Sequence, residues 1–423
     1  MIDMVGIGPF VVMPLVISYF HNGLFLWAWV FGALTAFVDA MIWSELGAAY
    51  PLAGGTYNFL RIGYSGKWGK LMSFLFVWQT SIQAPLVVAS GAIGFGQYLS
   101  YIVELSAVEQ KLVSGCLVIV VFLLLYRKIE TIGKISVVLW IVVVLTVAWI
   151  IFSGFTHQHH AVQFLPAGNE SFFSYAFWAA VGQGSVKTVY SYLGYYNVCH
   201  LGGEIKRPEK NIPKSIFFSI AGIAMLYLLM NISVMSVVSW QEIKPDEKHL
   251  LSLFMERIYG PEAGIIVTVL ILWIALASLF AIVLGYSRIP YAAAIDGNFF
   301  KIFSKLHPTK NFPYVSLIFL CALGFLFSLL FKLGQVIDSI LAMRILIQFI
   351  GQTIGLVLLR KRMGTSTLPF KMWLYPLPVI LSICIWLFLF ASTGWFALWG
   401  TLIAVIGMGV YYVTQTLNRT IVH

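Results

Sequence analysis

The chain begins MIDMVGIGPFVVMP, residues 1–14, and the GIGPF segment at 6–10 lies inside an apolar run that continues to residue 20. In a helix, glycine costs about 1 kcal/mol and an interior proline about 3 kcal/mol relative to alanine. The segment is therefore either not helical or part of a helix with a built-in interruption. The rest of the chain decides between these two possibilities.

The composition is that of a membrane protein. Hydrophobic residues make up 60% of the chain and charged residues only 10%, and the mean hydropathy is +0.91. A soluble domain has roughly 25% charged residues. A hydrocarbon core about 30 Å thick needs roughly 20 apolar residues per helix. The sequence supplies many such blocks and leaves no soluble domain over.

The apolar blocks predict an all-α polytopic protein that forms a single transmembrane domain over residues 1–423. Short polar stretches separate the blocks, and each block is long enough for one membrane span. We expect twelve spans, at residues 3–20, 24–49, 70–101, 111–126, 134–155, 172–200, 213–238, 261–286, 314–331, 335–359, 373–391 and 395–415.

The net charge of +10 is explained by the loops between these spans. Most of the 26 Lys and Arg residues fall in five loops on one side, whereas the other side keeps Lys111, Lys244, Lys248, Arg257 and Lys332. The positive-inside rule then places both termini in the cytoplasm, and we expect the protein in the plasma (inner) membrane. Nucleic acid binding is not needed to account for the charge.

Cysteine and histidine give no sign of a cofactor or a metal site. The four cysteines fall in apolar spans without CxxC spacing, which indicates packing thiols. The THQHH segment at 156–160 has no acidic residue or cysteine beside it, so a solvated loop explains it better than a metal site.

Two predicted spans are interrupted. Unpaired backbone groups are tolerated at membrane depth only where they line a cavity or are buried in protein. Span one breaks at 6–9, and span six carries YSYLGYYN at 190–197, with Gly194 among tyrosines. In transporters built from two inverted repeats of five spans, such paired breaks mark the substrate site.

The two breaks would offer complementary groups to a ligand. Free N–H groups suit a carboxylate and free carbonyls suit an ammonium, which together match a zwitterion. Helix packing is the alternative explanation of the tyrosines.

Three segments together resemble the permeases of the amino acid-polyamine-organocation superfamily. They are SELGAAYPLAGGTYNFL at 44–60, YLGYYNVCHLGGEIKRPEKNIPKSI at 192–216 and SRIPYAAAIDGNFFKIFSKLHPTKNFPYVSL at 287–317. The resemblance runs from the first span to at least the tenth. It implies the leucine-transporter fold, with a first repeat at 1–155, a second at 172–359 and two peripheral helices at 373–415.

The resemblance also implies site residues. The substrate carboxylate would bind the backbone amides of Gly6, Ile7 and Gly8. The amino group would bind the carbonyls of a second segment, formed by Tyr190, Ser191, Tyr192, Leu193 and Gly194. Tyr190 would act as an outward lid and Tyr195 as a pocket wall, and Glu204 would have a structural or gating role at the cytoplasmic face.

This chain departs from the family pattern at three places. Pro9 precedes Phe10, so the outer half of span one would leave at another angle. Proton-coupled relatives often place a lysine in span five, and residues 137–152 contain none, so the coupling ion stays open between proton and sodium. The family has a half-helix of about ten residues before the glycine break, whereas only MIDMV precedes it here. We expect the true start to lie upstream; the alternative is a chain without this half-helix.

Charged residues inside predicted spans are further candidates. An ionisable group at the bilayer centre costs at least about 2.5 kcal/mol, so it usually faces a cavity or a partner. Asp39 and Lys187 join Glu204 as gating or coupling candidates. Lys187 would bind a second substrate carboxylate or supply the positive charge missing from span five, unless it snorkels or pairs with Asp39. For Arg344 a structural pair across helices is expected.

Glu45 begins the ELGAAYP segment near the cytoplasmic end of span two. With the PLAGG segment that follows, it is expected to form an inner gate or a short helix over the inner exit, a role that rests on the family resemblance. A solvated loop is the plainer alternative.

The function that these features predict is secondary active transport of amino acids or related amines by alternating access, as a symporter or an exchanger. A polyamine or organocation permease and a non-transporting amino-acid sensor are the alternatives. A channel would need a continuous polar pore, and no enzyme motif is present. The expected partners are a small-molecule substrate and membrane lipid, and the sequence identifies no protein partner.

Overall fold

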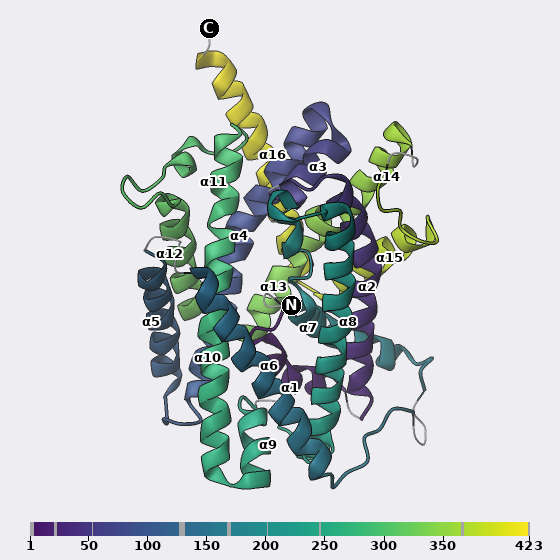
Figure 1. The fold of residues 1–423 in the computed structure, drawn as a ribbon, viewed down its shortest axis with the longest axis vertical. Helices are drawn as coiled ribbons and strands as arrows, with labels where there is room; N and C mark the ends of the chain where they lie inside the picture. The colour runs from purple at the N-terminus through teal and green to yellow at the C-terminus, as the bar shows by residue number, and fades with distance from the viewer. Residues whose placement is uncertain are drawn as a thin grey trace.

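The computed structural model describes residues 4–20, 23–52, 54–126, 132–166, 171–200, 202–244, 247–364 and 368–421. Within these ranges the chain is helical and contains no strand. Helices run roughly along the long axis of the molecule, with α1, α7 and α13 near its centre (Figure 1). This arrangement is the all-α polytopic architecture that the apolar blocks predict.

The helices of the first half are α1 (Gly8–Ser18), α2 (Leu26–Ala49), α3 (Thr56–Tyr64), α4 (Gly66–Leu99), α5 (Ala107–Leu125), α6 (Ile132–Thr156), α7 (Tyr175–Tyr192) and α8 (Pro208–Met235). Those of the second half are α9 (Leu250–Tyr259), α10 (Pro261–Tyr286), α11 (Arg288–Ile295), α12 (Tyr314–Leu330), α13 (Leu333–Arg344), α14 (Gln352–Met363), α15 (Leu377–Ser392) and α16 (Phe396–Ile421). A π-helical segment, Ile345–Gly351, joins α13 to α14.

Each of the twelve predicted spans coincides with a helix or with the continuous helical unit of α13, the π segment and α14. In the described part of the chain, seven helical stretches are long and apolar enough to cross a membrane, and four shorter apolar helices accompany them. Three shorter helices, α3, α9 and α11, lie between the spans. The helix after PLAGG is α3, which confirms the expected short helix in that region.

The helices pack around a continuous apolar core. Its largest cluster joins α1, α2, α7, α8 and α10 with α13. The long α4 contacts α12, α10, α13, α5 and α3. At 1.5 Å per residue, its 34 residues extend about 50 Å, more than the hydrocarbon core, so tilt or extension beyond the membrane is required. The four cysteines are free.

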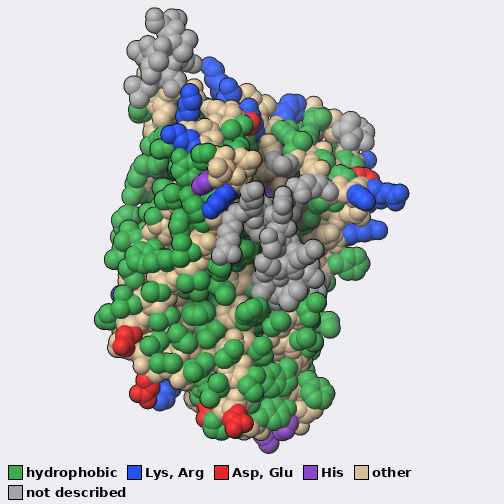
Figure 2. Space-filling model, turned by 60° about the vertical axis from the view of Figure 1, so that its left-hand side comes forward, with side chains coloured by type: hydrophobic (Ala, Val, Ile, Leu, Met, Phe, Trp, Pro, Cys, Tyr) green, Lys and Arg blue, Asp and Glu red, His purple; other side chains and the backbone are tan. Residues whose placement is uncertain are grey.

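The surface has a broad apolar middle and two charged ends. Lys and Arg side chains gather at the end that holds α3, α11, α14 and the C-terminus, and Asp and Glu side chains are prominent at the opposite end (Figure 2). Hydrophobic side chains cover the face between them. A belt of this kind fits a lipid environment, because exposed apolar surface of such extent is rare on soluble monomers.

Candidate substrate site

Two backbone interruptions meet at the centre of the molecule. The chain is not helical at Gly6 and Ile7, and α1 starts at Gly8 with Pro9 in its first turn. Proline fits the first turn of a helix without losing a hydrogen bond, so the helix continues through GIGPF from Gly8 onward. The GIGPF segment therefore contains the start of a helix, at Gly8, inside the predicted span 3–20.

The second interruption follows α7. The helix ends at Tyr192, and the chain turns through residues 193–196 into a short 3₁₀ helix, Asn197–His200. Gly194 has φ +114°, a conformation that side-chain-bearing residues rarely adopt. A glycine is therefore needed for this turn, and the break predicted from YSYLGYYN is present.

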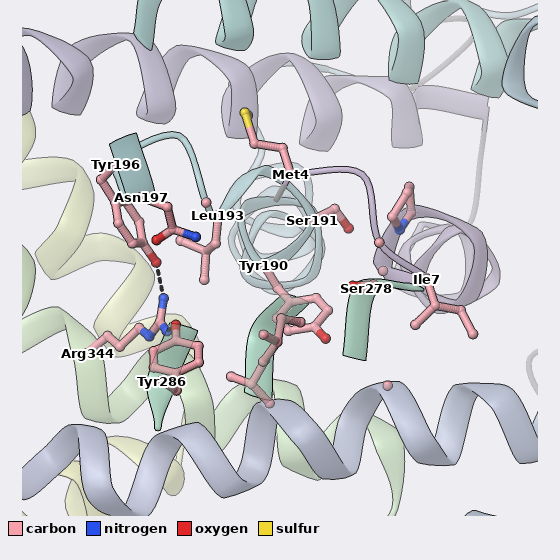
Figure 3. Close-up of a pocket in the computed structure, with 17 residues that line it drawn as sticks. Met4, Ile7, Tyr190, Ser191, Leu193, Tyr196, Asn197, Ser278, Tyr286 and Arg344 are labelled. Carbon is pink, nitrogen blue, oxygen red and sulfur yellow. Dashed lines mark hydrogen bonds between the residues drawn. The ribbon is translucent and has the colours of Figure 1, made fainter. Parts of the chain in front are cut away.

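Both interruptions line one cavity of about 80 Å³ (Figure 3). A water molecule needs roughly 10–15 Å³ by a comparable measure, so the space suits a small molecule. Besides the two breaks, α4, α10 and α13 contribute to its wall. Its lining residues are Met4, Gly6, Ile7, Gly8, Pro9, Val87, Gly91, Tyr190, Ser191, Leu193, Gly194, Tyr196, Asn197, Ser278, Ile282, Tyr286 and Arg344.

The glycines of the first break allow its backbone to approach the neighbouring helices. A Cβ atom on Gly6 would lie 2.5 Å from Ser278 Oγ, and one on Gly8 would lie 3.2 Å from the ring of Tyr190. The first of these distances is too short for any Cβ contact, so at least a serine side chain would have to move. The backbone of the break therefore packs closely against Ser278 of α10 and Tyr190 of α7.

The N-terminus of α1 has no side-chain cap. The first N–H groups of a helix have no partner within the helix, and they carry the positive end of the helix dipole. Such an end is suited to a carboxylate.

Tyrosine hydroxyl groups hold the two breaks in place. Tyr227 of α8 is fully buried, and its Oη donates to the carbonyl oxygens of Met4 (2.8 Å) and Ser191 (3.3 Å), so one side chain ties both breaks together. Tyr190 and Ser90 share a hydrogen bond of 2.6 Å between their hydroxyl groups. Sequence reasoning missed Tyr227; its only signal is a tyrosine in the middle of an otherwise apolar span.

The structure brings most of the predicted site residues together but excludes two of them. Gly6, Ile7, Gly8, Tyr190, Ser191, Leu193 and Gly194 all line the cavity. Tyr192 does not, because its hydroxyl donates to the Trp29 carbonyl at 3.3 Å. Tyr195 does not either, so its expected place in the pocket wall is corrected. The turn at Gly194 directs Tyr195 to α2 and brings Tyr196 to the cavity.

Asp39 is 1% exposed and lies on α2 behind the second break. It accepts hydrogen bonds from Tyr195 Oη at 2.6 Å and from Trp386 Nε1 at 3.2 Å. In the described part of the chain no cation pairs with it. The ring of Trp386 in turn stacks on the ring of Phe349 of the π segment, with 3.9 Å between the ring centroids. Asp39 therefore connects the break after α7 to α15 and the π segment.

Lys187 pairs with Asp338, not with Asp39. Its Nζ lies 2.5 Å from Asp338 Oδ1 and 3.0 Å from the Gly334 carbonyl oxygen. Lys187 is 1% exposed and the Asp338 side chain 22%. The pair joins α7 to α13, so the considered pairing with Asp39 and the snorkelling alternative are both wrong. Glu204 ends the short helix Gly202–Glu204, and its side chain lies outside the described part of the structure.

Arg344 has partners from other elements, as the expected structural pair across helices requires, but these partners are neutral. Its guanidinium donates to the hydroxyl oxygens of Tyr196 and Tyr286 and lines the cavity. None of the ion pairs between described residues includes it. Pairing cannot be read from helix spacing alone, because these partners come from the turn after α7 and from α10.

Glu45 and Arg360 form a buried pair at the charged end near α14. Arg360 Nε lies 2.5 Å from Glu45 Oε1, a second bond joins Arg360 to Oε2, and the Met372 amide donates to Oε2 at 2.7 Å. Glu45 is fully buried. The pair fastens α2 to α14 and to the segment before α15, so the solvated-loop alternative does not apply to Glu45.

Within the described residues, no group of three or more His, Cys, Asp and Glu side chains is placed to hold a metal ion. The amides of His159 and His160 donate to the Ser236 carbonyl oxygen at 2.7 and 2.8 Å. The histidine segment is thus fixed through its backbone.

Comparisons with known proteins show the family of this chain. A family model described as amino acid permease matches residues 1–416. The uncharacterized amino acid permease YecA of Bacillus subtilis is 30% identical over 291 residues, which are 68% of this chain and 65% of that protein. The serine/threonine exchanger SteT of the same organism is 25% identical over 92% of this chain and 87% of the relative. Its branched-chain amino acid permease BcaP is 24% identical over 91% and 84%, respectively.

The family match covers nearly the whole chain and agrees with the apolar helical architecture. The relatives are permeases and exchangers, not enzymes. The chain is therefore an integral membrane protein and belongs to the amino acid permease family of the amino acid-polyamine-organocation superfamily.

Proposed function

We propose that this permease is a secondary transporter that carries one small amino acid at a time by alternating access, as a symporter or an exchanger. The observation that carries the proposal is the meeting of two non-helical backbone segments, at the start of α1 and at the end of α7, at one cavity. In transporters built from inverted repeats, paired interruptions of this kind form the substrate site near the membrane midplane.

The two breaks offer complementary groups to a zwitterion. The N-terminus of α1 at Gly6, Ile7 and Gly8 would receive the substrate carboxylate on backbone N–H groups. Backbone carbonyls of the second break, at 190–194, would receive the ammonium group. The cavity size supports a small amino acid. The similarity to the serine/threonine exchanger SteT and the branched-chain amino acid permease BcaP supports an amino acid as the substrate.

The fold that accompanies this function is the leucine-transporter fold. In this proposal residues 1–155 and 172–359 are the two inverted repeats, and residues 373–415 are peripheral helices. The support is positional, since the non-helical segments at the start of α1 and after α7 lie in the first and the sixth predicted spans.

We place both termini in the cytoplasm and the protein in the plasma membrane. The support is the concentration of Lys and Arg at the end with α3, α11 and α14 (Figure 2) and the positive-inside rule. In this orientation the Lys187–Asp338 pair lies toward the outside and the Glu45–Arg360 pair toward the inside. These pairs are the proposed clamps of the outer and inner gates. Asp39 is the proposed coupling residue, because it is buried without a cationic partner.

The test is transport by the purified protein in proteoliposomes. Radiolabelled amino acids and polyamines are offered with and without a proton or sodium gradient, and liposomes without protein serve as the control. We expect saturable uptake or exchange of at least one amino acid. Binding in a thermal-shift assay without any flux would instead indicate a sensor, and a continuous single-channel current would indicate a channel.

A further inference from the structure

One positive charge faces the proposed substrate cavity. Arg344 is 4% exposed and stands at the end of α13, directly before the π segment. Figure 3 shows Arg344 with Tyr196 and Tyr286 at one end of the cavity, and Ile7 and Ser278 of the first-break side at the other. The guanidinium is thus separated from the break that would hold the substrate carboxylate.

Among the described residues, no acidic side chain forms an ion pair with Arg344. The cavity lining contains no Asp or Glu, and the direct partners of the guanidinium are two neutral phenol oxygens. Its Nε has no hydrogen-bond partner among the described residues. A guanidinium has five N–H donors, so donors remain after both tyrosines are satisfied.

Two other buried cations of this protein have carboxylate partners. Lys187 has Asp338, and Arg360 has both carboxylate oxygens of Glu45. Burial of an unpaired charge is costly, and intramembrane charges are usually paired or face a functional cavity. The missing counter-charge at Arg344 therefore points to a ligand that brings its own.

We propose that Arg344 binds an anionic group on the substrate side chain, so that the preferred substrates are amino acids with an acidic side chain. This inference rests on the proposed function. The α-carboxylate and ammonium groups occupy the two breaks, and the side-chain carboxylate reaches the guanidinium at the far end. A neutral amino acid would leave the charge uncompensated.

Tyr196 and Tyr286 are positioning residues in this arrangement. They come from the turn after α7 and from the end of α10, and each holds one terminal nitrogen of the guanidinium. A planar guanidinium fixed at two corners presents its remaining donors in a defined direction, which suits recognition of a carboxylate. Because Tyr196 belongs to the second break, movement of that break would also move the side-chain subsite.

The experiment compares acidic and neutral amino acids in proteoliposomes. Wild type should take up or exchange L-aspartate or L-glutamate in preference to L-asparagine and L-glutamine. In Arg344→Gln the half-saturating concentration of the acidic substrate should rise roughly ten- to hundredfold, since a hydrogen bond to a charged group has that effect on affinity. Asparagine and glutamine transport should persist or improve. Arg344→Lys should be intermediate, because it keeps the charge but not the planar fork.

The control is Arg257→Gln, which removes an exposed arginine of α9 outside the cavity. It should leave the selectivity unchanged. A thermal-shift measurement with aspartate, glutamate and their amides gives a binding readout independent of flux. If Arg344→Gln does not fold, Tyr286→Phe and Arg344→Lys provide the same comparison, and each should lower the preference for the acidic substrate.

The outcomes separate the two proposals. Transport of neutral amino acids without acidic ones by wild type would overturn this inference and leave the proposed function standing. Equal loss of all substrates in a folded Arg344→Gln protein would also overturn it, since the arginine would then serve the α-carboxylate common to all of them. Failure of wild type to move any amino acid would instead count against the proposed function.

Discussion

Two buried carboxylates on the same helix have opposite surroundings. Asp39 and Glu45 both lie on α2 and are 1% and 0% exposed. Glu45 is held by Arg360 and a backbone amide. Asp39 accepts hydrogen bonds from the neutral donors of Tyr195 and Trp386, and it has no cationic partner among the described residues. The buried cations differ in the same way. Lys187 pairs with Asp338, whereas Arg344 has no carboxylate partner among the described residues.

The presence or absence of a charged partner divides the buried charges into two kinds. A paired buried ion is fixed by its partner, and its loss leaves the other ion unpaired. A buried ion with neutral partners keeps the capacity to bind a proton, a cation or a charged ligand, and such groups concentrate at functional sites. The paired charges here join helices, and the unpaired ones lie at or directly behind the two breaks.

The largest expected effect comes from breaking the Glu45–Arg360 pair. Glu45→Gln leaves a buried guanidinium without its anion, which should lower the free energy of unfolding by about 3–5 kcal/mol. Thermal unfolding of the purified protein, followed by size-exclusion profile, measures the change. The matched double variant Glu45→Met with Arg360→Met should recover most of the loss. A single variant as stable as wild type would show that the pair does not hold α2 to α14.

A smaller loss is expected at the Lys187–Asp338 pair. Asp338→Asn keeps a hydrogen-bond acceptor for Lys187 Nζ, the Gly334 carbonyl remains, and the side chain of Asp338 is 22% exposed. Stability should fall by about 1–3 kcal/mol. The same unfolding assay measures it, and Asp338→Glu serves as the charge-preserving control. A loss as large as that of Glu45→Gln would remove the distinction between the two clamps.

Asp39→Asn should change function more than stability. The amide can still accept from Tyr195 and Trp386, so the free energy of unfolding should stay within about 1 kcal/mol of wild type. Because only the carboxylate can bind and release a proton or a cation, uptake should lose its dependence on an ion gradient, while exchange continues. Uptake and exchange in proteoliposomes check this. Gradient-driven uptake that survives in the variant would exclude Asp39 as the coupling residue.

The smallest effect is expected at the exposed pair of Glu242 and Arg257. Their charged atoms lie 2.6 Å apart, and the hydrogen bond from Arg257 lowers the pKa of the Glu242 carboxyl below its ordinary 4.5. Because the carboxyl pKa is lower in the folded state than in the unfolded state, the ionised pair stabilises the fold at a pH above the unfolded-state pKa. This stabilisation is lost as the pH falls through the folded-state pKa. Glu242→Gln should therefore change stability by less than about 1 kcal/mol at neutral pH, and by still less below about pH 4.

The fold and the two breaks were predictable because their signals are local. Apolar length marks the spans, and Gly6, Gly8 and Gly194 mark the interruptions wherever the helices pack. The partners of the charges were not predictable, because they depend on which helices meet. Lys187 lies 151 positions from Asp338 and Arg344 lies 148 positions from Tyr196. The presence of Tyr196 in the cavity wall in place of Tyr195 likewise follows from the turn at Gly194, which no helical periodicity describes.

The π segment at Ile345–Gly351 divides one continuous helical unit into α13, which contacts the cavity, and α14, which is joined to α2. Relative to an unbroken α-helix, one inserted residue rotates every later side chain by roughly 100° about the axis. Upstream of this widened coil, Arg344 points into the cavity, and downstream Arg360 reaches Glu45. The offset lets one continuous helical unit direct one arginine to the cavity and another to Glu45 of α2. Removal of the extra residue would turn one of the two arginines away from its present neighbours.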